Sequence, residues 1–343
     1  MTAVLSVRGL TTVLHLADGP VEVVKDVSFD VGAGETVALV GESGSGKSMT
    51  MLSVMGLHPQ PTAEIVRGEV LLEGVDLVGA DDRYRRSVRG AAMAMVYQDP
   101  MTSLNPLMRI GAQIEEVLTA HGTPRRTAEK RALEVLAEVG IAQPVRAAQS
   151  FPHEFSGGMR QRVVIAMAIA LRPALLIADE PTTALDVTIQ QQIIALVARL
   201  QAETGTAVMW ITHDLGVVAR VASRLLVMYA GHLVETGPTR GVFARPEHPY
   251  TAGLIGAIPP ARGAERLPLR QIPGAPPDAA YSPSGCPFHP RCPEAVQRCQ
   301  VEMPKLTQRP GSAAACWVPP SDWVAPARPD PAPALGVVAE PAT

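Results

Sequence analysis

Residues 35–57 read ETVALVGESGSGKSMTMLSVMGL, and this stretch predicts the class of fold. TVALV predicts a short buried strand, and KSMTMLSVMGL predicts the helix that follows it. Residues 41–48, between them, match the phosphate-loop pattern G-x-x-x-x-G-K-[ST], whose glycines let backbone N–H groups point inward. A glycine-rich turn that matches by chance is the alternative. Expected nucleotide contacts are Gly41, Ser43, Gly44, Gly46, Lys47 and Ser48, and Ser48 is also expected to bind Mg²⁺.

A second stretch, ALLIADEP at residues 174–181, predicts an apolar strand that ends on two carboxylates. Asp179 suits Mg²⁺, through a water molecule, and Glu180 is placed to act as general base on an attacking water. Adjacent residues on a strand point to opposite faces, so the two carboxylates are expected to act separately. An acidic turn after a buried strand is the alternative interpretation.

A third stretch, EFSGGMRQRVVIAMAIALRP at residues 154–173, predicts a glycine-rich turn that opens a helix. Such a helix start is a second anion-binding device. Ser156, Gly157 and Gly158 in this turn resemble the signature motif of ABC-type ATPases. The resemblance implies an α/β fold: a P-loop NTPase core with a RecA-like sheet, and an α-helical subdomain. In that family two ATPase domains pair head-to-tail, and each signature closes over the ATP held by the other domain.

The same resemblance assigns roles to further residues. Gln98 in VYQDP resembles the glutamine that senses Mg²⁺ and the attacking water, and His213 in WITHD resembles the histidine that contacts the γ-phosphate. Asp186 in TALD resembles the aspartate at the dimer seam. Many members stack adenine on an aromatic residue, but the matching region LTTVLHLADG contains none, so His15 or Leu14 would take that place.

The composition of the sequence limits the partners and the cellular location to be expected for this chain. The 343 residues are 47% hydrophobic and carry a formal net charge of −3, which allows a large core and indicates no nucleic-acid partner. The sequence contains no apolar run long enough to cross a bilayer, and its start lacks the pattern of a signal peptide. We therefore expect the chain to stay in the cytosol. A peripheral position on the cytoplasmic side of the cell membrane is what its resemblance to ATPase subunits of membrane transporters, described next, implies.

The residues of three longer stretches indicate which group of ABC ATPases the chain resembles. VYQDPMTSLNPLMRIGAQIEEVL, EPTTALDVTIQQQII and RPEHPYTAGLIGAIP resemble the D-type ATPases of dipeptide/oligopeptide ABC importers. The resemblance implies an F-type ATPase as heterodimer partner, two transmembrane permease subunits, and indirectly an extracytoplasmic peptide-binding protein. A nickel or other small-solute importer is one alternative. A soluble ABC ATPase that remodels macromolecules is another.

All four cysteines lie late in the chain, at positions 286, 292, 299 and 316. Four thiolates suit either Zn²⁺ or an iron–sulfur cluster. Zinc sites favour close C-x₂₋₄-C pairs, which are missing here, and unliganded thiols are a third possibility. The family resemblance supports a [4Fe–4S] cluster, with Zn²⁺ as the alternative. Its expected ligands are Cys286, Cys292, Cys299 and Cys316, and its expected role is structural, with redox sensing as the alternative.

These patterns predict three segments. Residues 1–261 form the ATPase domain, with its helical subdomain at about 99–160, and residues 262–320 form a loop-rich extension with the cysteines. Residues 321–343, rich in Pro and Ala, are expected to form a mobile tail. We expect changes at the cysteines to loosen the extension and leave the chemistry of the phosphate loop intact.

Overall fold

The computed structural model describes residues 3–183, 185–258 and 271–323. The tail predicted at 321–343 therefore lies outside the described residues from 324 onward, as do residues 262–270 of the extension. The chain divides into two compact units, which are described one at a time. The first unit contains Met1–Ser6, Asp30–Glu35 and Leu71–Trp210, and the second contains Val7–Phe29, Thr36–Val70 and Ile211–Thr343.

The first unit contains strands in the order β8-β7-β6, with β8 continuing into the second unit. Their bounds are β6 (Met93–Val96), β7 (Leu175–Asp179) and β8 (Ala207–Thr212), and the short β5 (Val75–Asp76) pairs with the end of β4. β6 and β7 run parallel, with Met93 opposite Leu175 and Val96 opposite Ala178. Every residue of β7 is buried, as expected for a parallel strand covered on both faces.

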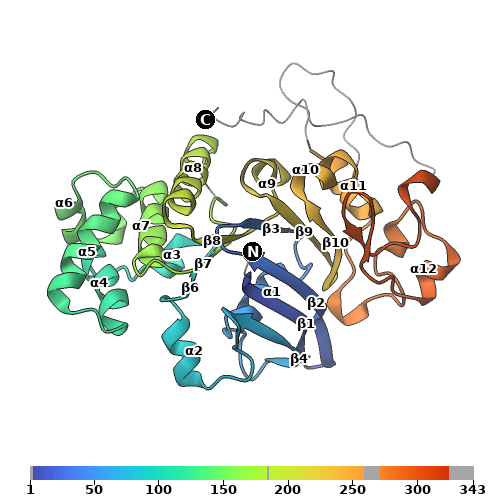
Figure 1. Cartoon of the computed structure of the whole chain (residues 1–343), viewed down its shortest axis with the longest axis horizontal. Coiled ribbons are helices and arrows are strands. Elements are labelled where there is room, and N and C mark those ends of the chain that lie inside the picture. Colours follow the sequence, from blue (N-terminus) through green and yellow to red (C-terminus); the bar gives the residue numbers. More distant parts are fainter. Residues whose placement is uncertain (1–2, 184, 259–270, 324–343) are drawn as a thin grey trace, which may run out of the picture. The chain divides into compact units, whose positions relative to one another are not determined.

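Among the helices of the first unit, α5 packs against α4, α6 and α7 in one group (Figure 1). The buried residues of α5 are Ala128, Ala132, Val135 and Leu136, which repeat at helical spacing and form one apolar face. The helices are α2 (Asp82–Val88), α3 (Pro100–Ser103), α4 (Ile110–Ala120), α5 (Arg125–Glu138), α6 (Pro144–Gln149), α7 (Gly157–Ile169) and α8 (Val187–Thr204).

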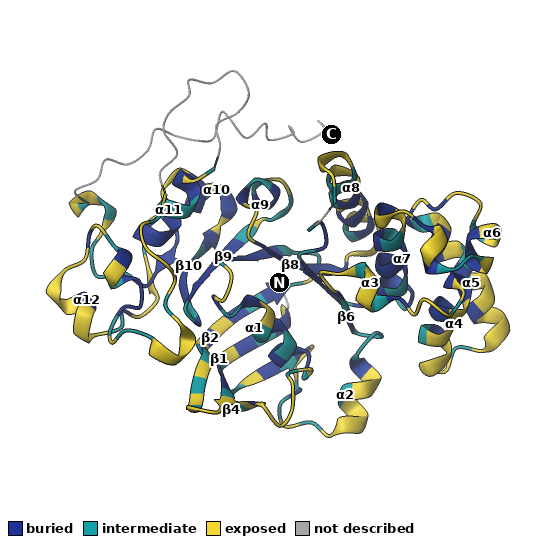
Figure 2. Cartoon of the chain, turned by 180° about the vertical axis from the view of Figure 1, so that it is seen from behind, coloured by how far each residue is buried: buried dark blue, intermediate teal, exposed yellow. Residues whose placement is uncertain are grey.

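In the second unit, strands follow the order β3-β9-β10-β12-β11. β3 runs parallel to β9, and β10 runs antiparallel to β9. The two-residue β12 adds to β10, with Glu235 opposite Ala314, so the C-terminal extension continues the ATPase sheet. Figure 2 shows β9 and β10 mostly buried. The bounds are β3 (Thr36–Val40), β9 (Arg224–Tyr229), β10 (His232–Pro238), β11 (Thr307–Gln308) and β12 (Ala313–Ala314).

A second sheet, in the order β2-β1-β4, has most of its residues in the second unit. Its strands are β1 (Ala3–Leu16), β2 (Gly19–Gly32) and β4 (Ala63–Leu72). The helices of this unit are α1 (Lys47–Val54), α9 (Leu215–Val221), α10 (Thr239–Ala244), α11 (Pro249–Gly256) and α12 (Gln297–Val301). No helix among the described residues of either unit is long and apolar enough to cross a membrane.

The extension shares a hydrophobic core with the strands of the second unit. Phe288 of the extension is 2% exposed, and its ring centroid lies 5.3 Å from that of Tyr229 on β9 and 5.4 Å from that of Tyr250 on α11. Cys286 and Cys299 belong to the same buried cluster. The extension, which was predicted to be loop-rich, is therefore packed into this unit.

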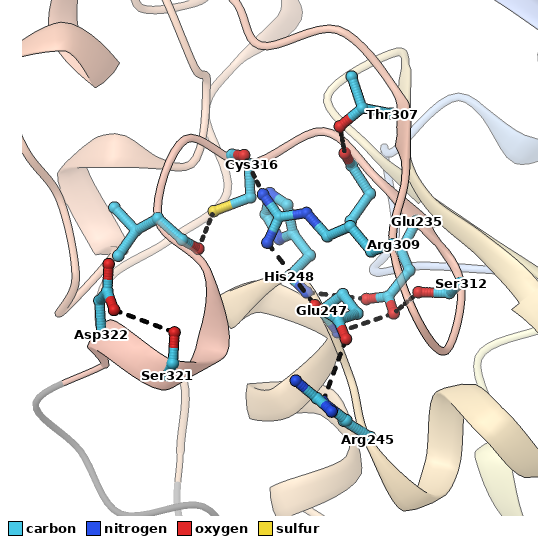
Figure 3. A network of polar contacts seen from close by, with 12 residues as sticks. Glu235, Arg245, Glu247, His248, Thr307, Arg309, Ser312, Cys316, Ser321 and Asp322 are labelled. Carbon is cyan, nitrogen blue, oxygen red and sulfur yellow. Dashed lines mark hydrogen bonds and ion pairs between the residues drawn. The ribbon is translucent and has the colours of Figure 1, made fainter.

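A buried polar network also attaches the extension to β10 (Figure 3). The carboxylate of Glu235 is fully buried and accepts hydrogen bonds from the N–H groups of Glu247 and His248, at 2.8 and 3.0 Å. It also accepts one from the hydroxyl of Ser312 in the extension, at 2.7 Å. Arg309 pairs with Glu247 at 3.7 Å and donates to the carbonyl of Cys316. Buried carboxylates need such partners, so the network fixes where the extension lies.

Candidate functional site

The predicted phosphate loop links β3 to α1 and is held by close backbone approaches. A Cβ atom added at Gly41 would lie 2.2 Å from the carbonyl oxygen of Met228, and one at Gly46 would lie 2.6 Å from that of Val23. Gly44 and Gly46 have φ of 78° and 99°, a region in which glycine is not strained. The close approaches explain why the motif specifies glycine at positions 41 and 46, and the positive φ favours glycine at position 44, which the motif leaves open.

Lys47 is the first residue of α1, and its side chain is buried against the loop. Its ammonium group donates to the carbonyl oxygens of Gly41 and Glu42, at 2.8 and 2.9 Å. Ser48 follows in the first turn of α1. A lysine ammonium and the N-terminus of a helix at one loop make a strongly anion-attracting site, as phosphate binding requires.

Two further residues that the sequence assigns to the nucleotide site belong to the second unit. His15, near the end of β1, has a 47% exposed side chain, and its Nε2 lies 3.3 Å from a carboxylate oxygen of Glu64. His213 directly follows β8, before α9, whose first turn is capped by the carboxylate of Asp214. Their assignment to adenine and γ-phosphate stays a prediction.

In the first unit, the strand-end carboxylates lie where β7 stops. Asp179 is the last residue of β7 and is 8% exposed. Glu180 has already left the strand, with φ of 46°. The alternation argument, which placed both carboxylates on one strand, therefore does not apply to Glu180, because its direction is set by this left-handed turn.

Two neighbours hold the carboxylate of Glu180. The side-chain amide of Gln98 donates to Glu180 Oε2 at 3.0 Å, and the hydroxyl of Thr183 donates to the same oxygen at 2.9 Å. The structure thus brings together two of the three residues predicted as catalytic. Thr183 was not predicted from the sequence, although it lies three residues after Glu180 in the TTALD segment.

The predicted signature turn opens α7. The hydroxyl of Ser156 accepts from the N–H of Met159 at 3.4 Å, so it caps the helix. Gly158 approaches α8 closely, because an added Cβ would lie 2.6 Å from Ile189 Cγ2. Asp186 caps α8 by accepting from the N–H of Ile189 at 2.9 Å. The turn and Asp186 therefore lie at the starts of two helices that pack together, and both helix starts attract anions.

The stretch RPEHPYTAGLIGAIP contains the element His-Pro-Tyr at residues 248–250. Its histidine, His248, is 1% exposed, and its Nδ1 accepts from the N–H of Tyr250 at 3.1 Å, which caps α11. Burial lowers the pKa of His248 to about 3. A neutral imidazole is what this capping role requires, because the acceptor nitrogen must carry no proton. The sequence indicated this element without indicating that its role is to start a helix.

The four cysteines converge, and none forms a disulfide. All four line one cavity of about 10 Å³. Burial raises the pKa of Cys286 to about 11 and that of Cys292 to about 12, and the neighbouring thiols add to both shifts. Burial also raises the pKa of Cys316. Such thiols ionise at neutral pH only when a cation binds them.

The number and chemistry of these donors fit a four-thiolate group. Their arrangement does not yet match a metal site. In the part of the chain that the structure describes, no three or more His, Cys, Asp or Glu side chains are arranged to hold a metal ion. The structure thus brings the four predicted ligands to one cavity, but their side chains are not arranged in a coordination geometry.

The phosphate loop, the strand-end carboxylates and the Ser-Gly-Gly helix start together define an ABC-type ATPase. Comparison with protein families agrees. A family described as "ABC transporter" matches residues 24–183, and one described as "Oligopeptide/dipeptide transporter, C-terminal region" matches residues 234–299. The predicted α/β fold with a P-loop ATPase core is confirmed.

Named relatives extend over most of the chain. The dipeptide transport ATP-binding protein DppD of Bacillus subtilis is 48% identical, over 93% of this chain and 95% of its own length. The oligopeptide transport ATP-binding protein OppD of Salmonella typhimurium is 46% identical, over 92% and 93%. The solved ATP-binding cassette MJ0796, a dimer bound to ADP and Pi, is 28% identical with a TM-score of 0.61, covering 68% of this chain and 98% of its own.

These relatives show that the chain belongs to the family of ATP-binding subunits of peptide ABC transporters, which hydrolyse ATP to drive transport. The family resemblance predicted from the sequence is thereby confirmed. ATP and Mg²⁺ are the expected ligands of such a subunit. The roles of single residues stay predictions.

Proposed function

We propose that this chain powers the import of di- and oligopeptides from the cytoplasmic face of the membrane. The matched C-terminal region, residues 234–299, carries this proposal, because the family that it matches is described by oligopeptide and dipeptide transport. Relatives named for dipeptide and oligopeptide transport support the same substrate class. Two permease subunits would form the path, and an extracytoplasmic protein would deliver the peptide.

Transport by the assembled complex tests the substrate class. The complex of this chain with its partner ATPase, its two permeases and its binding protein is placed in lipid vesicles, and uptake of labelled di- and oligopeptides is measured with ATP. We expect ATP-dependent uptake of peptide and peptide-stimulated ATP hydrolysis. Uptake of Ni²⁺ or of another small solute, without uptake of any peptide, would instead support the small-solute importer.

Within the ATPase site, the resemblance distributes the roles as follows. Gly41, Ser43, Gly44, Gly46 and Lys47 would bind the triphosphate, and His15 is the proposed adenine contact. Ser48, Gln98 and Asp179 would hold Mg²⁺, which shields phosphate charge during hydrolysis. Glu180 would accept a proton from the attacking water, and its two hydrogen-bond donors at 2.9 and 3.0 Å support this role by fixing the carboxylate. His213 would contact the γ-phosphate.

We further propose that this chain works as half of a heterodimer with an F-type ATPase. Ser156, Gly157 and Gly158 would close over ATP held by the partner, and Asp186 would lie at the seam. The solved ATP-binding cassette MJ0796 is a dimer, which supports the pairing of two ATPase domains. Purification of the transporter through a tagged permease should recover two different ATPase chains in equal amounts. Two copies of this chain, with no second ATPase, would contradict the heterodimer.

The four thiols are proposed to hold a [4Fe–4S] cluster that keeps the extension folded. Their convergence on one cavity supports this proposal, and a cluster of this type needs four cysteine ligands. Protein purified without oxygen should contain about four iron and four labile sulfide per chain. Zinc without iron or sulfide would support the four-thiolate zinc site instead, and the absence of both metals would leave four unliganded thiols.

A further inference from the structure

The extension also touches the phosphate loop. Arg291, between two of the cysteines, forms two hydrogen bonds to the carboxylate of Glu42, from Nη1 to Oε2 at 2.7 Å and from Nη2 to Oε1 at 3.1 Å. Only 6% of the Arg291 side chain is exposed, against 26% for Glu42. Nη1 also lies 3.2 Å from the hydroxyl of Tyr229, and Nε donates to the carbonyl of Pro273 at 2.8 Å. The guanidinium thus has three partners, Glu42, Tyr229 and Pro273, and its fixed position orients the paired carboxylate.

A second residue holds the backbone at the same position. The hydroxyl of Tyr250, on α11, accepts from the N–H of Glu42 at 2.8 Å, and Tyr250 is fully buried. The carbonyl of Glu42 in turn accepts from the ammonium of Lys47 at 2.9 Å. The N–H, the carbonyl and the carboxylate of Glu42 therefore each have a partner, and two of these partners, Tyr250 and Arg291, come from C-terminal elements.

The charge at Glu42 explains why these contacts matter. The phosphate-loop pattern leaves this position open, so phosphate binding does not require a carboxylate here. A carboxylate in a loop that binds triphosphate repels the ligand unless a cation neutralises it. Arg291 supplies that cation through a bidentate pair, which also turns the carboxylate toward the extension.

We propose that Arg291 of the C-terminal extension and Tyr250 of α11 are positioning residues of the nucleotide site, and that they set the affinity of this chain for ATP. Neither residue is assigned a contact with ATP. Arg291 neutralises and orients the Glu42 side chain, and Tyr250 fixes the backbone where the loop leaves β3. This assignment concerns the established ATPase activity and does not depend on the transported solute or on whether the cysteines bind iron, zinc or no metal.

The main test is the dissociation constant of ATP for the purified full chain, with the thermal unfolding midpoint measured alongside. Arg291→Met should weaken ATP binding about tenfold, because it leaves Glu42 charged and unpaired beside the phosphates. Arg298→Met is the matched control: Arg298 lies in the same extension and pairs with Glu302 through two hydrogen bonds of 2.7 and 3.1 Å. It should leave ATP affinity within about twofold of the parent.

A second substitution separates positioning from general loss of structure. Adding Glu42→Gln to Arg291→Met removes the unpaired charge and should restore ATP affinity to within about threefold of the parent. A purely structural role of Arg291 predicts no such recovery. Unchanged ATP affinity in Arg291→Met, or no recovery in the double variant, would overturn the role of Arg291.

Tyr250→Phe tests the backbone contact and guards against a poorly folded Arg291 variant. It keeps the buried ring and removes only the hydroxyl that accepts from Glu42, so it should fold and weaken ATP binding about threefold. In the assembled transporter, both variants should raise KM for ATP with little change in kcat, because neither residue is assigned a role in the hydrolytic step. Parental affinity in Tyr250→Phe would remove Tyr250 from the proposal.

Discussion

Gly158→Ala tests how closely the signature turn packs, because two effects of known size oppose each other at this position. The added Cβ would lie 2.6 Å from Ile189 Cγ2, a distance that requires the two helices or the side chain to move. Overpacking of this kind costs about 1–3 kcal/mol. Alanine in place of glycine in a helix gains up to about 1 kcal/mol. The clash should prevail, and we expect Gly158→Ala to lower the free energy of unfolding by about 1 kcal/mol.

The neighbouring glycine provides a matched control. An alanine Cβ at Gly157 would have Leu185 Cδ2 as its nearest neighbour, at an ordinary contact distance of 3.7 Å. Gly157→Ala should therefore be neutral or slightly stabilising when urea unfolding of the full chain is followed by circular dichroism. Truncation of the neighbour, Ile189→Ala, should abolish the cost of Gly158→Ala. Equal stability of the two alanine variants, or a cost that persists after Ile189→Ala, would refute the packing argument.

Three further predictions concern catalysis, the buried network and pH. Glu180→Gln should lower ATP turnover by at least about 100-fold while retaining ATP binding, as loss of a general base requires. Ser312→Ala removes a hydrogen bond to the buried Glu235 carboxylate and should cost about 2 kcal/mol in urea unfolding, whereas the exposed Ser321→Ala should cost nothing measurable. Burial lowers the pKa of His232 from 6.5 to about 4. Below pH 6.5 the unfolded chain therefore gains a proton that the folded chain does not, and stability should fall by about 1.4 kcal/mol per pH unit until about pH 4. His232→Gln should flatten this part of the profile.

The sequence predicted those parts of the site whose geometry is local. β3 ends at Val40 and α1 begins at Lys47, as the phosphate-loop pattern requires, because the close approaches at Gly41 and Gly46 demand glycine at fixed spacing. Ser156 likewise starts α7 where the sequence placed a helix start. Each of these features depends on residues within one short stretch, so a pattern read along the chain could reveal it.

Predictions that relied on the regularity of an element were weaker. The strand ALLIA was predicted correctly as β7, but the direction of Glu180 was derived from strand alternation, and this residue adopts a left-handed turn instead. Pairing between strands that lie far apart in the sequence could not be predicted either. β12 contains two alanines and no strand pattern, yet it pairs with β10, with Ala314 opposite Glu235. The adjacent Ser312 bonds to the Glu235 carboxylate from 77 residues away in the sequence.

The contact between Arg291 and Glu42 joins residues 249 positions apart and changes how the extension is understood. From the sequence, we expected changes at the cysteines to leave the phosphate loop unaffected. Arg291, however, directly precedes Cys292, and its own N–H bonds to the carbonyl of Phe288 at 2.9 Å, so the backbone around the cysteines positions this guanidinium. Loosening that backbone would withdraw the cation from a carboxylate that remains in the phosphate loop. Folding of the extension and binding of ATP are therefore coupled, and each should stabilise the other.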